Sequence, residues 1–202
     1  MKKILGLVVL FVIIISSCFY FFIRQPKNIF DEIYQETEKT YRSNNILRNI
    51  DGFKIRPDWP NDGEYFAYTP SGKYQTHPEG YKDISISFNF GEGIKGMTIR
   101  FERKTNSNIT LWYSAHYNIK KKILKKELAI FEEPRQPGQF IDDEEKVREY
   151  LRKNNISKEE LEKDFDEIVN QKVLKDWCSI YDSKYSPSNY GDVKVETQWE
   201  NW

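Results

Sequence analysis

Apolar and polar residues alternate through the middle of the chain, and this pattern predicts a β-sheet. It is clearest in three segments, residues 83–90, 97–104 and 109–119. In "DISISFNF" every second residue from Ile84 to Phe90 is apolar, and serine or asparagine stands between them. Successive residues of a strand point to opposite faces, so each segment predicts a strand with one packed face and one mainly polar face. The glycine-rich "GEGIKG" between the first two segments predicts a hairpin, and the three strands form an antiparallel meander.

Other strands are predicted around this meander. The segment "KKKILKKELAIFEE" suits either a helix or a strand by its spacing, and the neighbouring strands favour another strand. The alternation in "YGDVKVETQW" predicts a final strand. Between residues 53 and 80, Asn61-Asp62-Gly63 and Ser71-Gly72 are turn signals between short strands.

Helical spacing appears on both sides of the sheet segments. Apolar residues recur at helical intervals in "IFDEIYQETEKTY", residues 29–41, which predicts an amphipathic helix that ends before Asp51-Gly52. Asp142 can cap a helix in "DEEKVREYLRKN", and Ser157 begins a capping box for a helix that continues to about Lys175. Residues 29–202 are therefore expected to form an α+β domain, an antiparallel meander with an N-terminal helix and a C-terminal helix pair packed on one side.

The run from Ile4 to Ile23 contains twenty residues and no charge, and it predicts a membrane anchor. A helix of that length spans roughly 30 Å, the thickness of the hydrocarbon core. Residues 1–3 form a basic cytoplasmic n-region, and residues 24–28 link the anchor to the domain. The positive flank at Lys2-Lys3 favours an N-terminus in the cytoplasm and an extracytoplasmic C-terminal domain. The expected location is thus the cell membrane, crossed once.

Cys18 leaves a second interpretation of this run open. Ile15-Ser16-Ser17-Cys18 resembles a lipoprotein processing site, in which a signal peptide ending at residue 17 is removed and Cys18 is lipidated. The apolar run continues past Cys18 to Ile23, which a spanning helix needs and a lipid anchor does not, so we favour the uncut helix. Both interpretations give one membrane tether and an extracytoplasmic domain. Cys178 is the only other cysteine, which excludes an internal disulfide in the domain and fits a Gram-positive surface protein.

Few residues suggest catalysis. His77 and His116 are the only histidines, and neither has cysteine or carboxylate neighbours at metal-ligand spacing. No nucleophile–base set is visible. We therefore expect no catalytic residue, no metal, no cofactor and no enzymatic activity. Formal charge is zero overall, but nine bases stand against Glu102 between Lys95 and Lys126. This basic sheet region suits an acidic partner, whereas an extracytoplasmic location makes nucleic acid a poor candidate.

The polar face of the predicted sheet carries the candidate binding residues. Alternation places Arg100, Trp112 and His116 together on the face opposite the Ile84/Ile99/Leu111 row. Tryptophan and arginine concentrate binding energy at interfaces. If helices cover the apolar row, this polar face stays open and is expected to carry the contact with a protein partner.

Four segments give the chain its resemblance to a known family: "MKKILGLVVLF", "IFDEIYQETEKTY", "DISISFNFGEGIKGMTIRFERK" and "DWCSIYDSKY". With these segments the chain resembles the TipC family of streptococcal immunity proteins over nearly its whole length. The resemblance implies a role in interbacterial competition, as an inhibitor that protects its producer outside the membrane from a toxin delivered by type VII secretion. It also implies that this toxin is a phosphatase that degrades lipid II. A cell-surface lipoprotein that binds a substrate or a wall polymer is the alternative.

Overall fold

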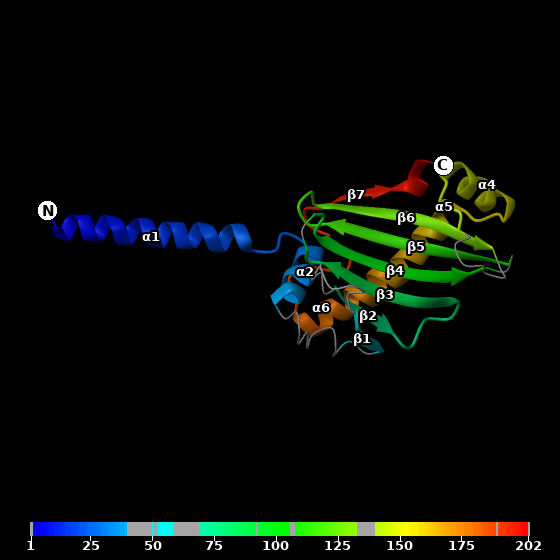
Figure 1. The fold of residues 1–202 in the computed structure, drawn as a ribbon, viewed down its shortest axis with the longest axis horizontal. Coiled ribbons are helices and arrows are strands. Elements are labelled where there is room, and N and C mark those ends of the chain that lie inside the picture. The colour runs from blue at the N-terminus through cyan, green and yellow to red at the C-terminus, as the bar shows by residue number, and fades with distance from the viewer. Residues whose placement is uncertain are drawn as a thin grey trace.

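The computed structural model describes residues 2–39, 50, 52–58, 69–91, 93–105, 108–132, 140–188 and 190–201. The described strands form a single sheet in the order β1-β2-β3-β4-β5-β6-β7 (Figure 1). Their bounds are β1 Phe53–Asp58, β2 Thr69–Tyr74, β3 Tyr81–Asn89, β4 Gly96–Lys104, β5 Ile109–Asn118, β6 Ile123–Glu132 and β7 Lys194–Thr197. The order follows the chain, which confirms the predicted meander.

Strands β1 to β6 pair antiparallel with their neighbours. The segment whose spacing suits either a helix or a strand forms β6, as the neighbouring strands predict. The predicted final strand is β7, but it runs parallel to β6, with Ile123 opposite Lys194. The direction follows from the connection. The helices between the two strands carry the chain back along the sheet, so β7 starts at the same end as β6 (Figure 1).

Helices lie before β1, between β6 and β7, and after β7. Their bounds are α1 Lys2–Arg24, α2 Ile29–Lys39, α4 Glu144–Lys153, α5 Lys158–Phe165, the π-helix η1 Asp166–Leu174, α6 Lys175–Tyr181 and the short 3-10 helix η2 Gln198–Asn201. Helices α5, η1 and α6 follow one another directly and cross behind the sheet (Figure 1). Helix α4 lies beside β6, where Ile141 pairs with Ile130 and the Tyr150 hydroxyl donates to Glu132. The predicted N-terminal helix and C-terminal helix pair are thus present.

The core lies between the sheet and the helices behind it. The apolar row of the sheet, with Ile84, Ile99 and Leu111 at most 1% exposed, faces this layer. Helix α2 contributes Phe30 and the α5–α6 run contributes Trp177, both buried. Burying an aliphatic or aromatic side chain of this kind contributes about 1.5–3 kcal/mol. The packing therefore fixes which face of the sheet is covered.

A buried carboxylate joins α5 to three strands. Asp164 is 3% exposed. It accepts hydrogen bonds from the Tyr81 hydroxyl at 2.9 Å, from Arg103 Nη1 at 2.6 Å and from the Tyr113 hydroxyl. These donors come from β3, β4 and β5. Burial raises the pKa of the Tyr81 hydroxyl well above its usual value, and the hydrogen bond to Asp164 makes the next largest contribution. The neutral phenol therefore remains a donor to this carboxylate.

Two details of the sequence interpretation are wrong. Ser71-Gly72 is not a turn but lies inside β2, because the ring of Phe53 on β1 packs against Gly72. A Cβ atom at Gly72 would lie 1.6 Å from Phe53 Cζ, so glycine is required for the close approach. The cap of α4 is Asp143, whose side chain accepts from the Lys146 N–H at 3.1 Å, and not Asp142. Asn61-Asp62-Gly63 lies outside the described residues.

Other local predictions are confirmed. Ser157 caps α5 by accepting from the Glu160 N–H, and the glycine-rich segment joins β3 to β4. His77 lies in the loop after β2, and His116 lies on β5.

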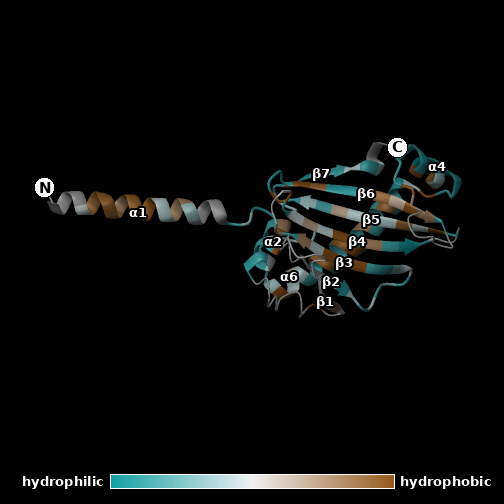
Figure 2. Ribbon diagram, in the orientation of Figure 1, coloured by the Kyte–Doolittle hydropathy of each residue, from teal (hydrophilic) through white to brown (hydrophobic). Residues whose placement is uncertain are grey.

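Helix α1 is unbroken from Lys2 to Arg24 and projects away from the domain (Figure 1). Its described side chains are those of residues 6–20, and the large apolar ones among them are at least half exposed. Figure 2 shows the apolar colour along much of this helix. Across the described part of the chain, no helix combines the length and the apolarity needed to cross a membrane.

Candidate functional site

The face of the sheet opposite the helices is open. Most side chains on this face are partly buried along β3, β4 and β5, whereas Glu102, Thr110 and Ser114 are buried. Arg100, Trp112 and His116 lie on it, as the alternation predicts. All three line one hollow of about 220 Å³, and Arg100 and His116 also line a neighbouring hollow of about 520 Å³. The structure therefore brings the three predicted residues together.

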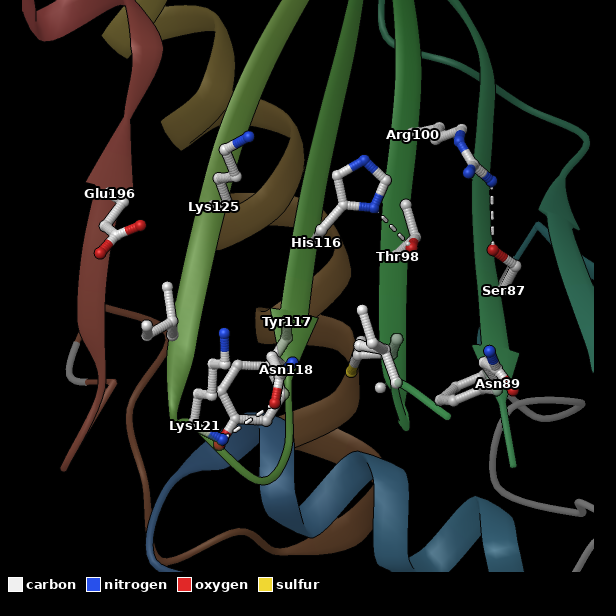
Figure 3. A pocket seen from close by; sticks show the side chains of 15 residues that line it. Ser87, Asn89, Thr98, Arg100, His116, Tyr117, Asn118, Lys121, Lys125 and Glu196 are labelled. Carbon is white, nitrogen blue, oxygen red and sulfur yellow. Dashed lines mark hydrogen bonds between the residues drawn. The ribbon is translucent and has the colours of Figure 1, made fainter. Parts of the chain in front are cut away.

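Arg100 is the central cation of this face. Its Nη1 donates to Ser87 Oγ on β3 at 3.2 Å (Figure 3). Among the described residues no carboxylate forms an ion pair with it. Burial lowers the pKa of its guanidinium, because removing water disfavours the charged form. A guanidinium keeps its charge even so, and Arg100 presents a partly desolvated cation with donors free for a partner's acceptor.

His116 is held by its neighbours on β4 and β6. Its Nδ1 lies 2.9 Å from Thr98 Oγ1, and its Nε2 lies 3.2 Å from Glu127 Oε2. Lys125 also donates to Glu127. The hydrogen bond with His116 contributes most to lowering the pKa of the Glu127 carboxyl to about 2, and the hydrogen bond from Lys125 lowers it further. Glu127 is therefore ionised at neutral pH and orients the imidazole at the surface.

Trp112 belongs to an aromatic cluster on the same face, and with Phe140 it lines the smaller hollow beside Arg100. Its ring centroid lies 5.8 Å from that of Phe131 and 6.2 Å from that of Phe140. Phe140 is 45% exposed, although it is a large apolar side chain. Trp112 itself is only partly buried, so it is not a core residue. The cluster offers an exposed aromatic surface next to the Arg100 cation.

Sequence reasoning missed several members of this face. Ser87 and Thr98 could have been found, because the same alternation places them beside Arg100. Glu127 could not, because the strand assignment of its segment and its register against His116 were open. Phe140 has no signal in the sequence, since it reaches Trp112 through the bridge between Ile141 and Ile130.

The predicted basic sheet region is divided between the two faces. Arg103 and Lys126 point to the helix side, where they pair with Asp164 and Glu162. Lys126 Nζ also lies 4.2 Å from the centroid of the Phe165 ring. These cations stabilise the fold and are not available to a partner, so the positive charge of the open face is smaller than the sequence indicates.

Within the described ranges, no three histidine, cysteine, aspartate or glutamate side chains are grouped so that they could hold a metal ion. Cys18 is an exposed thiol on α1. Cys178 is a partly buried free thiol whose Sγ donates to the Tyr185 carbonyl at 3.4 Å. Burial raises the pKa of the Cys178 thiol, which favours its protonated form.

Comparison with known proteins agrees with the resemblance seen in the sequence. Residues 1–198 match the family described as TipC immunity protein-like. The solved structure of TipC2 from Streptococcus intermedius B196 is 42% identical to the chain, with a TM-score of 0.80. The match covers 89% of this chain and 99% of that one. No curated protein sequence matches the chain. The chain therefore belongs to the TipC immunity protein-like family.

Proposed function

We propose that this protein neutralises a secreted antibacterial toxin by binding it with the open face of the sheet. The observation that carries the proposal is the grouping of Arg100, Trp112 and His116 around two adjoining hollows on a face that no described helix covers. The family supplies the immunity role. Inhibition then consists of occluding the toxin's active site or the approach of its substrate, and it requires no chemistry from the immunity protein.

The open face suits a partner with acidic and apolar groups. Arg100 can donate bidentate hydrogen bonds to a carboxylate. Such an ion pair also offsets the unfavourable free energy of holding this cation partly away from water. The Trp112–Phe140 pair can bury an apolar side chain of the partner next to that ion pair. An arginine and an aromatic cluster side by side form a compact centre of binding energy with a polar rim.

The location of this contact is the outer face of the membrane. The apolar run from Ile4 to Ile23 supports a tether, and the basic residues before it support an extracytoplasmic domain. The toxin that the resemblance implies, a lipid II phosphatase exported by type VII secretion, acts where lipid II is exposed. A tethered inhibitor is concentrated at that surface.

A direct experiment mixes the purified protein with the toxin encoded beside its gene. We expect a stable complex in size-exclusion chromatography and stoichiometric loss of phosphate release from lipid II. A toxin that remains free and fully active at micromolar concentrations of this protein would reject the proposal. A non-cognate toxin of the same class serves as the control for specificity.

A further inference from the structure

The chain enters the domain at a fixed point, at one end of the sheet. The Tyr185 hydroxyl donates to the Pro26 carbonyl at 2.6 Å, two residues after α1 ends. Asn28 Nδ2 donates to the Tyr117 hydroxyl near the end of β5 at 2.8 Å. Figure 1 shows α1 leaving from the same end as the turns that join β3 to β4 and β5 to β6. These two turns therefore lie beside the exit of the proposed membrane anchor.

The two turns form a single surface that we name the anchor-end tip, residues 93–95 and 119–121. The Ile119 N–H donates to the Lys95 carbonyl at 3.2 Å and joins one turn to the other. Asn118 Oδ1 accepts from the backbone N–H groups of Lys120 and Lys121 and holds the second turn. These hydrogen bonds connect the two turns to each other and to the end of β5.

The composition of the anchor-end tip is unusual for a solvated turn. Ile94 is 73% exposed, more than Phe140 at 45% or Ile180 at 37%. Lys95, Lys120 and Lys121 are exposed on the same tip, and Lys121 lines the larger hollow of the open face together with Ile94. Lys95 Nζ lies 3.5 Å from Glu38, a distant and solvated pair that salt screens readily. The hairpin sequence also contains one acid, Glu92.

An exposed apolar residue on a tip that also carries three exposed lysines matches the chemistry of a membrane surface. The apolar side chain enters the boundary between headgroups and acyl chains, while the lysine stems lie along it and their ammonium groups meet anionic headgroups. Each lysine near such a surface contributes roughly fivefold to the attraction. Three lysines and one isoleucine bind too weakly to hold a free protein, but they suffice to orient a protein that is already tethered.

We infer that the anchor-end tip rests on the membrane and contacts anionic lipid headgroups. The inference depends on the proposed tether and adds a second point of contact to it. Two contacts restrict the tilt of the domain, which a single helix leaves free. The open face is then held upright, at a constant height above the lipid surface, where a toxin approaches its lipid-linked substrate.

The test uses the full-length protein with Cys18→Ser and Cys178→Ser, reconstituted in lipid nanodiscs. One variant carries an environment-sensitive fluorophore at Ile94→Cys. The matched control carries it at Lys104→Cys, an exposed position at the opposite end of the adjoining strand β4. The discs contain phosphatidylcholine alone or with roughly 30% phosphatidylglycerol, and a lipid spin-labelled near its headgroup serves as the quencher.

We expect quenching of the Ile94 probe, but not of the Lys104 probe, in the anionic discs. About 1 M NaCl should abolish it, because the Debye length falls to about 3 Å. Changing Lys95, Lys120 and Lys121 together to Gln should lower the ratio of docked to undocked molecules by roughly 100-fold.

Three results would overturn the inference, and they differ in what they imply for the proposed function and for the proposed tether. If the chain copurifies with the discs and inhibits the toxin, but both probes behave alike, the inference fails and the proposed function stands. If Ile94→Ser weakens toxin binding measured without lipid, the tip belongs to the toxin interface instead. If the chain does not enter the discs at all, the proposed tether fails, and the inference fails with it.

Discussion

At the scale of the residue, the candidate site follows from the two-residue period of a strand. Trp112 and His116 share a face because they are four residues apart on one strand, and Arg100 joins them because β4 and β5 both turn their apolar row to the helices. Their neighbours could not all be found in this way. Glu127 depends on the pairing of β5 with β6, and Phe140 depends on a single bridge beyond β6. The sequence could thus predict the face and its three principal residues, but not the hydrogen bonds and ring contacts that orient them.

Arg100→Gln tests the cation at the centre of the site. We expect it to weaken toxin binding roughly thirtyfold, about 2 kcal/mol, because a charge-assisted hydrogen bond is lost. The free energy of unfolding should change by less than about 0.5 kcal/mol, since no described carboxylate depends on this charge. Titration calorimetry and urea denaturation measure the two effects. Lys104→Gln, at the exposed end of the same strand, should leave both unchanged, and wild-type affinity in Arg100→Gln would exclude this residue from the contact.

Trp112→Ala tests the aromatic cluster. Loss of the partly buried ring should weaken toxin binding by about 2 kcal/mol or more, roughly thirtyfold in affinity, while the protein stays folded. Trp199→Ala is the matched control, because Trp199 is 1% exposed and packs in the core. That change should cost about 3–5 kcal/mol of stability. Thermal unfolding and affinity measured on both variants separate the roles. If Trp112→Ala unfolds as readily as Trp199→Ala, Trp112 supports the fold and not the contact.

At the scale of the element, the sequence could predict what depends on local periodicity and missed what depends on distant packing. Strands β3 to β5 and the N-terminal helix emerge from their alternation and helical spacing. The parallel direction of β7 depends on the return path of the helices, which no local pattern encodes. The π-helix η1 depends on interior contacts such as that of Asn170, which donates to Asp166 and accepts from the Tyr190 hydroxyl. Ser71-Gly72 has the sequence signature of a turn, and only the packing of the Phe53 ring against Gly72 explains why a glycine stands inside β2.

The junction between α5 and the sheet depends on Asp164, and Asp164→Asn tests it. An amide of the same shape cannot accept all three hydrogen bonds, and Arg103 loses its buried counter-charge. We expect a loss of about 3–5 kcal/mol in the free energy of unfolding, measured by urea denaturation. Glu160→Gln removes the second carboxylate of Arg103, which lies 2.5 Å away and has a side chain 36% exposed. That control should cost less than about 1 kcal/mol. Equal losses in the two variants would show that Asp164 has no special role.

At the scale of the whole molecule, a domain with a covered face and an open face stands at the end of a single apolar helix. Cys18 lies within α1, and the helix runs through this position without a break. An uncut anchor is held by the burial of some twenty mostly apolar residues, to which one thiol adds little. Cys18→Ala should therefore remain in the membrane fraction with unchanged gel mobility. Release of the protein, or accumulation of a larger precursor, would show instead that Cys18 is a lipidation site.

The proposed tether should matter most when the inhibitor is scarce. An inhibitor confined to the membrane surface meets its toxin at an effective concentration far above its average in the medium, up to about millimolar for a short tether. Replacing residues 1–24 by a cleavable secretion signal leaves the open face intact, so the released domain should bind purified toxin with unchanged affinity. Cells that secrete the domain at native expression should nevertheless lose protection, because the released inhibitor is diluted. Raising expression should restore protection in proportion to the inhibitor concentration. Full protection by the secreted domain at native expression would show that location is not part of the mechanism, and that occlusion of the toxin alone is sufficient.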